Sequence, residues 1–389
     1  MKKILLIILA LSSVVFPLAC SDNNPNKASG PALPGGGGTG SGIATSTPNP
    51  SGGTLTPSPT IIASYRTSAA PNAMVMDPKF NLLYVAEGEN KGTGIVNMIG
   101  SYSVAANSLN GGPDDNRVVI GFETPTPPPP TPGITPIWQG VTVVLGIPEG
   151  IARSGPYFGL LDTSGSAATL YSGCKSFSLG SIPLGTTQYP NYPTSFGGVP
   201  FNSPKSLAGD AFGDFYVADV GNGYVDELYG ACSAVPPPTL TWLGRWNGSS
   251  SKFPFKKPSY VACDSVSQSV WVGDSGYIPA VVQAYSSGGT TLVTSWTAIT
   301  NCVIGGLAVD SGNTCAGVAG PCVYVSDIAN GGQIEVYTST GQLVRIWGDP
   351  HSVLEFLPFQ PGPVVPLGNP VSLIVVGDTD NDLLFLFGP

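Results

Sequence analysis

The sequence predicts an all-β fold, a six-bladed β-propeller of four-stranded antiparallel blades. A unit of a short apolar run, a polar turn and a β-branched or aromatic run ending in an acidic residue recurs along the chain. Two further apolar runs follow in most units, without helical periodicity, and four short strands per repeat are typical of a propeller blade. The chain also ends one strand short of a complete blade, while an orphan apolar run precedes the first unit.

The acidic residue that ends the second run of each unit is the clearest marker of the repeat. Its last four intervals are 57, 55, 53 and 51 residues, and the polyproline segment 125–136 accounts for much of a longer first interval. A carboxylate at a strand end accepts backbone N–H groups of the turn, so we interpret these residues as folding elements rather than a calcium or catalytic ring. The six markers are Glu87, Asp162, Asp219, Asp274, Asp327 and Asp378.

Closure of the ring follows from the two ends of the repeat region. The last unit stops after a third strand, Leu383 to Phe387, and lacks an outer strand. The run Thr60 to Tyr65 can supply it, so an N-terminal strand joins the last blade and no sheet edge is left free.

The pattern Tyr/Phe-Val-Ala/Ser-Asp-x-x-Asn resembles the core of the NHL repeat, a family of β-propeller blades. It is clearest at Asp219 with Asn222 and at Asp327 with Asn330. The resemblance covers residues 60–389 and implies a fold without implying a function.

The N-terminus predicts export and lipid anchoring. Residues 1–19 carry two lysines and an apolar core too short to span a bilayer, which is typical of a secretory signal peptide. Pro17-Leu18-Ala19-Cys20 resembles the lipobox of bacterial lipoproteins, which implies that Cys20 is lipidated and holds the chain in the cell membrane or outer membrane. If Cys20 is not modified, the chain is secreted. Residues 20–59, rich in Gly, Ser, Pro and Asn, read as a disordered tether.

Composition restricts the partners. The chain has 15 Lys and Arg against 24 Asp and Glu, for a net charge of −9. An acidic, weakly charged chain argues against nucleic acid as a partner, and we expect a protein or glycan ligand instead.

Aromatic residues divide into two sets. We expect Trp242, Trp296 and Trp347, which recur at blade spacing, in the core, and Trp138, Tyr189, Tyr192 and Trp246 as exposed candidates for stacking on glycans.

Six cysteines follow Cys20 in this exported chain, and their even number predicts up to three disulfides. Cys315 and Cys322 bracket a short loop with two glycines and a proline, so we expect these two to be bonded. The sequence leaves open the pairing of Cys174, Cys232, Cys263 and Cys302.

Catalytic chemistry has few candidate residues. His351 is the only histidine, which disfavours a serine-type triad or a zinc site with several imidazoles. The segment 378–382 has three carboxylates in the manner of a calcium loop, but it coincides with a blade turn. Glu149 invites comparison with six-bladed lactonases of the gluconolactonase type, which hold a divalent metal in the channel, and no other ligand of theirs can be matched here.

We therefore expect an envelope-anchored binding or scaffold propeller with no cofactor and no assigned catalytic or metal-binding residue. The alternative is an extracytoplasmic metal-dependent hydrolase or lyase with its site in the propeller channel. Long segments between strands, residues 106–140 and 180–203, serve binding and catalysis equally well.

Overall fold

The structure of this protein is a computed structural model that describes residues 61–388 apart from several internal segments. Those segments are 68, 79–81, 92–93, 106–107, 113–117, 123–138, 144–146, 155–156, 165–166, 175–176, 180–194, 197–198, 231–239, 311, 313, 348–358, 369–370 and 372. No helix among the described residues is long and apolar enough to cross a membrane.

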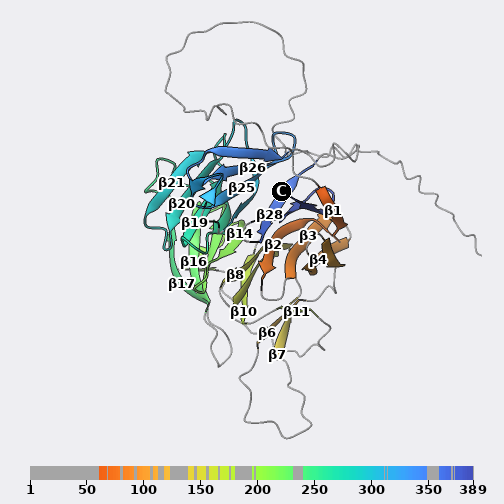
Figure 1. The fold of residues 1–389 in the computed structure, drawn as a ribbon. Helices are drawn as coiled ribbons and strands as arrows, with labels where there is room; N and C mark the ends of the chain where they lie inside the picture. The colour runs from red at the N-terminus through yellow and green to blue at the C-terminus, as the bar shows by residue number, and fades with distance from the viewer. Residues whose placement is uncertain are drawn as a thin grey trace, which may run out of the picture. The chain divides into compact units, whose positions relative to one another are not determined.

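The described strands form an all-β propeller with five four-stranded antiparallel blades, each named here by its innermost strand (Figure 1). The β2 blade contains β2 (Pro71–Asp77), β3 (Leu82–Lys91), β4 (Gly94–Ala105) and β5 (Ser108–Gly112). The β14 blade contains β14 (Pro204–Gly209), β15 (Asp214–Asp219), β16 (Tyr224–Gly230) and β17 (Leu240–Trp246). The β18 blade contains β18 (Pro258–Cys263), β19 (Ser269–Asp274), β20 (Val281–Ser286) and β21 (Leu292–Thr297). The β22 blade contains β22 (Ile304–Val309), β25 (Cys322–Asp327), β26 (Gln333–Thr338) and β27 (Leu343–Trp347).

The last blade is completed by the N-terminal strand, as the sequence predicts. The β28 blade contains β28 (Pro361–Leu367), β29 (Leu373–Asp378) and β30 (Leu383–Phe387), and β1 (Ile61–Arg66) forms its outer strand. β1 runs antiparallel to β30, with Ile61 opposite Phe387 and Arg66 opposite Leu383. The Thr67 N–H continues the contact by donating to the Asp382 carbonyl at 2.9 Å.

A sixth sheet lies where the sequence predicts the second blade. It has three strands in the described part of the chain: β8 (Ile147–Ser154), β9 (Tyr157–Ser164) and β10 (Ala167–Cys174). The predicted fourth strand is absent from this sheet as described. Smaller pieces are the sheet of β6 (Val118–Phe122), β7 (Gln139–Val143) and β11 (Phe177–Leu179), and the hairpins β12 (Ser195–Phe196) with β13 (Val199–Pro200) and β23 (Thr314–Cys315) with β24 (Val318–Ala319).

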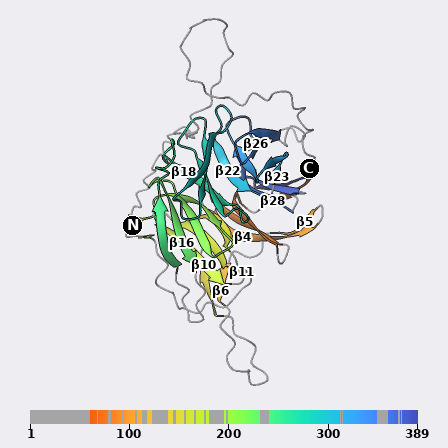
Figure 2. The same ribbon diagram turned by 60° about the vertical axis from the view of Figure 1, so that its left-hand side comes forward.

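The innermost strands of the six sheets contact one another in a closed cycle. β2 contacts β8, β8 contacts β14, and the contacts continue through β18, β22 and β28 back to β2. Figure 2 shows β18, β22 and β28 as neighbours in this cycle. The first strands of all the sheets therefore surround one central space.

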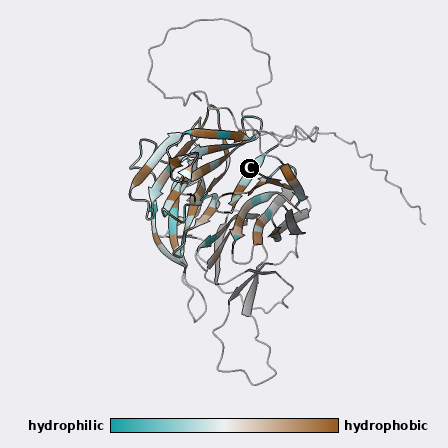
Figure 3. Ribbon diagram, in the orientation of Figure 1, coloured by the Kyte–Doolittle hydropathy of each residue, from teal (hydrophilic) through white to brown (hydrophobic). Residues whose placement is uncertain are grey.

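The apolar core lies between neighbouring sheets, and Figure 3 shows the apolar segments along their strands. One buried cluster joins the β14 and β18 blades through Tyr216 and Tyr285, and another joins the β18 and β22 blades through Trp271 and Tyr337. These strands alternate aromatic and β-branched residues, which fill the space between two pleated faces. Burial between the sheets is what fixes each blade against the next.

The core prediction is right for two of the three tryptophans. Trp296 and Trp347 are buried, whereas Trp242 is 38% exposed. In the β14 blade the equivalent position is Trp246, which pairs with Val225 as Trp296 pairs with Val282 and Trp347 with Ile334. Trp246 packs against the β18 blade, with its ring 6.4 Å from that of Tyr285, so it is not the exposed ring that the sequence predicts. The prediction failed because β17 extends to residue 246, beyond the run at 240–242 that the sequence suggests.

Several predicted features lie outside the described residues. They are the signal peptide and tether, Cys20, the polyproline segment 125–136, Trp138, Tyr189, Tyr192, Cys232 and His351.

Candidate functional site

Four of the six acidic markers, Asp219, Asp274, Asp327 and Asp378, are turn acceptors, as the sequence predicts. Asp219 ends β15 and is fully buried. One carboxylate oxygen accepts the Asn202 N–H at 2.8 Å, and the other accepts the side-chain amide of Asn222 at 2.7 Å. Asn222 also donates to the Pro200 carbonyl, so the motif joins the end of the second strand to the chain entering the first.

A similar arrangement recurs in the β22 and β18 blades. Asp327 accepts the Val303 and Ala329 N–H groups and the amide of Asn330. Asp274 has Tyr277 in place of the asparagine and accepts three backbone N–H groups instead, from Lys256, Lys257 and Gly276.

The segment with three carboxylates follows this pattern too. Asp378 accepts the Gln360 and Asp380 N–H groups and the Asn381 amide, at 3.4, 3.2 and 2.8 Å. Oxygens engaged by turn donors are not free to ligate a cation. The segment 378–382 is therefore a blade turn, and the calcium-loop alternative gains no support.

The central space is a cavity of about 350 Å³ that is lined by the innermost strand of every sheet. The strand register shows which residues lie at one end of this channel. Pro148, Pro204 and Pro258 pair with the markers Asp162, Asp219 and Asp274. The residues that follow these prolines therefore lie at the marker end of the channel, which we call the channel mouth.

Three polar side chains from consecutive sheets come together at the channel mouth. They are Glu149 of β8, Lys205 of β14 and Tyr260 of β18, and all three line the cavity. Glu149 was the one channel residue that the sequence singled out. Lys205 and Tyr260 were missed, although a signal for them exists: the residues after the repeat proline differ from unit to unit, while the proline and the acidic marker recur.

The opposite half of the mouth is formed by glycines. Gly305 and Gly306 follow Ile304 in β22, and Gly362 follows Pro361 in β28. A Cβ on Gly306 would lie 2.1 Å from the Gly362 carbonyl oxygen, so only glycine permits this approach of β22 to β28. One half of the mouth thus carries charged and polar side chains, whereas in the other half β22 and β28 approach each other through glycine backbone.

The electrostatics of the mouth act differently on its two ionisable groups, Lys205 and Glu149. The Lys205 ammonium lies 5.0 Å from the centroid of the Tyr260 ring. The pKa of Lys205 is raised, first by Tyr260 and further by Glu149, against the lowering effect of desolvation. Burial raises the pKa of Glu149, and Lys205 opposes that shift. Lys205 is therefore a protonated cation and not an amine nucleophile.

The far end of the channel is arranged differently. Arg153 of β8 faces the buried Asp77 of β2, with a nitrogen–oxygen distance of 3.8 Å. Cys263 of β18 lines the same end, and burial followed by Asp210 raises its thiol pKa well above the ordinary value. A protonated thiol is a poor nucleophile, so Cys263 offers no reactive group.

A buried cluster outside the channel consists of Cys302, Asp327 and Glu335, whose ligand atoms all lie within 4.8 Å of one another. Its oxygens already have partners. Glu335 accepts from Tyr337 and Gln333, and Asp327 accepts the turn donors described above. Burial raises the pKa of Glu335 to about 8. The hydrogen bond from Tyr337 opposes this rise, and the nearby Asp327 carboxylate adds to it. Glu335 is thus largely a neutral acid at neutral pH, which suits a hydrogen-bonded core group better than a metal ligand.

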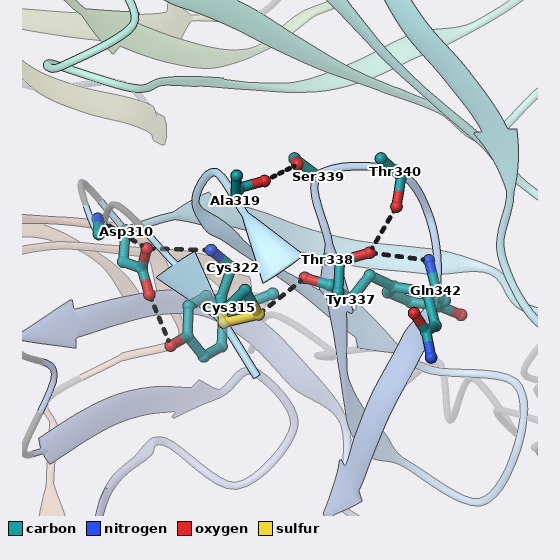
Figure 4. Close-up of a disulfide and its surroundings, with 11 residues drawn as sticks. Asp310, Cys315, Ala319, Cys322, Tyr337, Thr338, Ser339, Thr340 and Gln342 are labelled. Atoms are coloured by element: carbon teal, nitrogen blue, oxygen red, sulfur yellow. Dashed lines mark hydrogen bonds between the residues drawn. A yellow bond between two sulfur atoms is a disulfide. The ribbon is translucent and has the colours of Figure 1, made fainter. Parts of the chain in front are cut away.

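The predicted disulfide between Cys315 and Cys322 is present and closes the β23–β24 hairpin (Figure 4). Asp310 accepts the Cys322 N–H at 3.0 Å and the Tyr324 hydroxyl at 3.1 Å. Ser339 donates to the Ala319 carbonyl and ties the hairpin to the turn after β26. Cys263 and Cys302 are free thiols.

No family model matches the chain, and no curated protein sequence matches it. Among solved structures, it is similar to Raptor from Chaetomium thermophilum, with a TM-score of 0.48 and 10% identity over 84% of this chain and 29% of that one. It is similar to U3-55K, with a TM-score of 0.47 and 9% identity over 87% of this chain and 100% of that one. It is also similar to an auxiliary nutrient binding protein from Bacteroides thetaiotaomicron, with a TM-score of 0.46 and 9% identity over 83% of this chain and 69% of that one. The NHL resemblance stays a prediction from the repeat motif.

Proposed function

We propose that this protein is an envelope-anchored binding or scaffold propeller, held by lipid at Cys20, whose ligand site is the channel mouth. The observation that carries the binding role is the group of Glu149, Lys205 and Tyr260, which converges on one cavity from three consecutive sheets. A concave site with a few convergent polar groups is the usual form of a ligand pocket. A cavity of about 350 Å³ takes a small molecule or the end of a glycan or protein chain.

Two finer features belong to the same proposal. The β8–β10 sheet is the sixth blade, because β8 occupies its place in the cycle of innermost strands. The blades are NHL-like, because the Asp and Asn of the motif make the same hydrogen bonds in the β14 and β22 blades.

The alternative function is a metal-dependent hydrolase or lyase with its site in the channel. Glu149 is what favours it, since its carboxylate lines the cavity. Among the described residues that line this cavity, Glu149 is the one carboxylate, and the residues include no histidine. A hard divalent cation takes six or more oxygen ligands, so this lining suits a polar ligand better than a metal.

A thermal-shift screen of the purified mature protein with small polar metabolites tests the binding role. We expect ligands whose shift is lost in Lys205→Met and kept in Lys252→Met, since Lys252 lies outside the cavity lining. Metal analysis of the same preparation tests the alternative. Stoichiometric divalent metal, whose removal by a chelator lowers the melting temperature, would replace the binding proposal with the enzyme.

Mass spectrometry of the mature N-terminus tests the anchor. We expect a chain that begins at Cys20 and carries lipid, and an unmodified or different first residue would contradict it.

A further inference from the structure

The channel mouth has two chemically different halves. In the cycle of innermost strands, β8, β14 and β18 are consecutive and carry Glu149, Lys205 and Tyr260. The other three strands contribute small or apolar residues at the level of Tyr260, namely Gly306 of β22, Pro363 of β28 and Ala73 of β2. A molecule inside the channel therefore meets charged groups on one side and apolar groups on the other.

Position within the repeat separates folding residues from ligand residues at this mouth. The proline and the acidic marker recur from unit to unit and make the same pairings, which is what a folding element requires. The residue after the proline is Asn72, Glu149, Lys205, Ser259 or Gly362, so the fold does not dictate it. Asn72 is structural, since its amide donates to the Gly88 and Pro148 carbonyls. Among the described residues, neither Glu149 nor Lys205 has such a backbone partner.

Glu149 and Lys205 attract each other without closing into an ion pair. Each shifts the pKa of the other in the direction that opposite charges produce. The ion pairs found among the described residues are Arg153–Asp77 and Arg245–Asp226, and neither includes Glu149 or Lys205. One carboxylate and one ammonium thus face a shared space with a net charge of zero.

Charge compensation selects the ligand class. Binding a ligand expels water from both ions, and an ion that loses water without gaining a partner is costly. A purely anionic ligand would leave the Glu149 carboxylate without a partner. A purely cationic ligand would leave the Lys205 ammonium without one. A ligand with both an ammonium and a carboxylate compensates the two together.

Resting on the proposed binding function, we infer that the channel mouth binds a small zwitterion with an apolar side chain, of the class of an apolar α-amino acid. Its ammonium lies toward Glu149, its carboxylate toward Lys205 and Tyr260, and its side chain toward the apolar half formed by β22, β28 and β2.

Calorimetric titration of the purified mature protein with four matched compounds tests this class. L-Leucine carries both charges and an apolar side chain, L-leucinamide lacks the carboxylate, 4-methylvalerate lacks the ammonium, and glycine lacks the side chain. We expect L-leucine to bind at least tenfold more tightly than each of the other three. Equal binding of 4-methylvalerate or L-leucinamide, or no binding of L-leucine, overturns the zwitterion.

Substitutions of the channel residues test where L-leucine binds. Glu149→Gln and Lys205→Met should each weaken L-leucine binding at least tenfold, and Lys252→Met should not change it. Leucine binding that survives both channel variants overturns the assignment, and comparison of melting temperatures shows whether each variant is folded. If 4-methylvalerate binds as well as L-leucine and depends on Lys205, the zwitterion fails while the channel remains a binding site. The proposed function itself fails when no compound of any class binds in a Lys205-dependent manner.

Discussion

At the scale of single residues, four acidic markers accept turn donors in their blades, namely Asp219, Asp274, Asp327 and Asp378. Asp219 accepts the Asn202 N–H and the Asn222 amide, both from the chain that borders its own blade. Replacing Asp219 with Ala leaves these two donors, whose hydrogen bonds are partly buried, without an acceptor, so we expect the free energy of unfolding to fall by about 1–3 kcal/mol. Asp219→Asn keeps one oxygen acceptor and should cost less. Denaturant titration measures both, and equal stability of Asp219→Ala and the parent would contradict the role.

Glu335 should make stability depend on pH. Its pKa is raised to about 8 in the folded chain from an ordinary value of 4.5, so the native state holds a proton that the unfolded chain releases between these values. Stability is therefore highest below the unfolded pKa and falls as the pH rises through about 8.

Glu335→Gln should remove this part of the pH dependence. Gln283 occupies the equivalent register position in the β18 blade, and Tyr285 donates to it as Tyr337 donates to Glu335. We expect the variant to match the parent near pH 5 and to melt at a higher temperature at pH 8.5. An unchanged pH profile would show that Glu335 is not the titrating group.

At the scale of elements, each tryptophan that ends a fourth strand packs against the next blade. Trp296 of β21 lies against the turn between β26 and β27, where a Cβ on Gly341 would be 2.3 Å from the indole. Gly341 has a φ of +84°. Gly341→Ala should therefore suffer both backbone strain and a clash, and lose about 2–4 kcal/mol of stability.

Gly331→Ala is the matched control for the clash. Gly331 has a φ of +81°, and a Cβ there meets nothing within 4 Å. We expect this variant to show the strain alone, about 1–2 kcal/mol, in the same denaturant titration. If the two variants are equally destabilised, the packing of Trp296 on the turn contributes nothing.

The disulfide is a local element in the same blade. Cys315 and Cys322 close a loop with a sequence separation of seven. In the loop-entropy model its loss costs ~2–3 kcal/mol, so Cys315→Ser with Cys322→Ser should lower stability by that amount without opening the blade. Melting curves with and without reductant check this. A reductant effect that persists in the double variant would assign the stabilisation to another bond.

The sequence predicted which strands and turns are present better than it predicted the residues at which they end. The acidic markers, the strand runs and the Cys315–Cys322 pair follow from local patterns of two to eight residues, which is the range over which propensity acts. Trp242 was misplaced because β17 continues to Trp246, beyond the short apolar run at 240–242 from which its end was predicted.

At the scale of the whole molecule, the ring is closed by one strand from the far end of the chain. β1 covers the edge of β30 that would otherwise stay unpaired, and Tyr65 and Ala63 pack on the cluster shared with the β2 blade. A chain that begins at residue 60 should fold as well as the mature protein, whereas one that begins at residue 68 lacks β1 and should be strongly destabilised. Circular dichroism melts of the two truncations compare them. Equal melting temperatures would show that β1 is dispensable for closure.

The binding site belongs to the whole molecule, which is why the sequence indicated only one of its residues. Glu149, Lys205 and Tyr260 are about 55 residues apart along the chain and meet because three blades present the same strand to one axis. Comparison of the repeats position by position would have found Glu149 and Lys205, which follow the proline, and Tyr260, which lies one position further on. The three-dimensional fold was needed to show that Lys205 and Glu149 share one cavity.

The most direct test of the channel-mouth site is a crystal structure of the mature protein grown with L-leucine at saturating concentration. We predict electron density for the ligand between Glu149 and Lys205, with its side chain toward the half of the channel formed by β22, β28 and β2. A well-ordered ligand at the Arg153 end of the channel, or on the outer surface with the mouth occupied by water alone, would contradict the account.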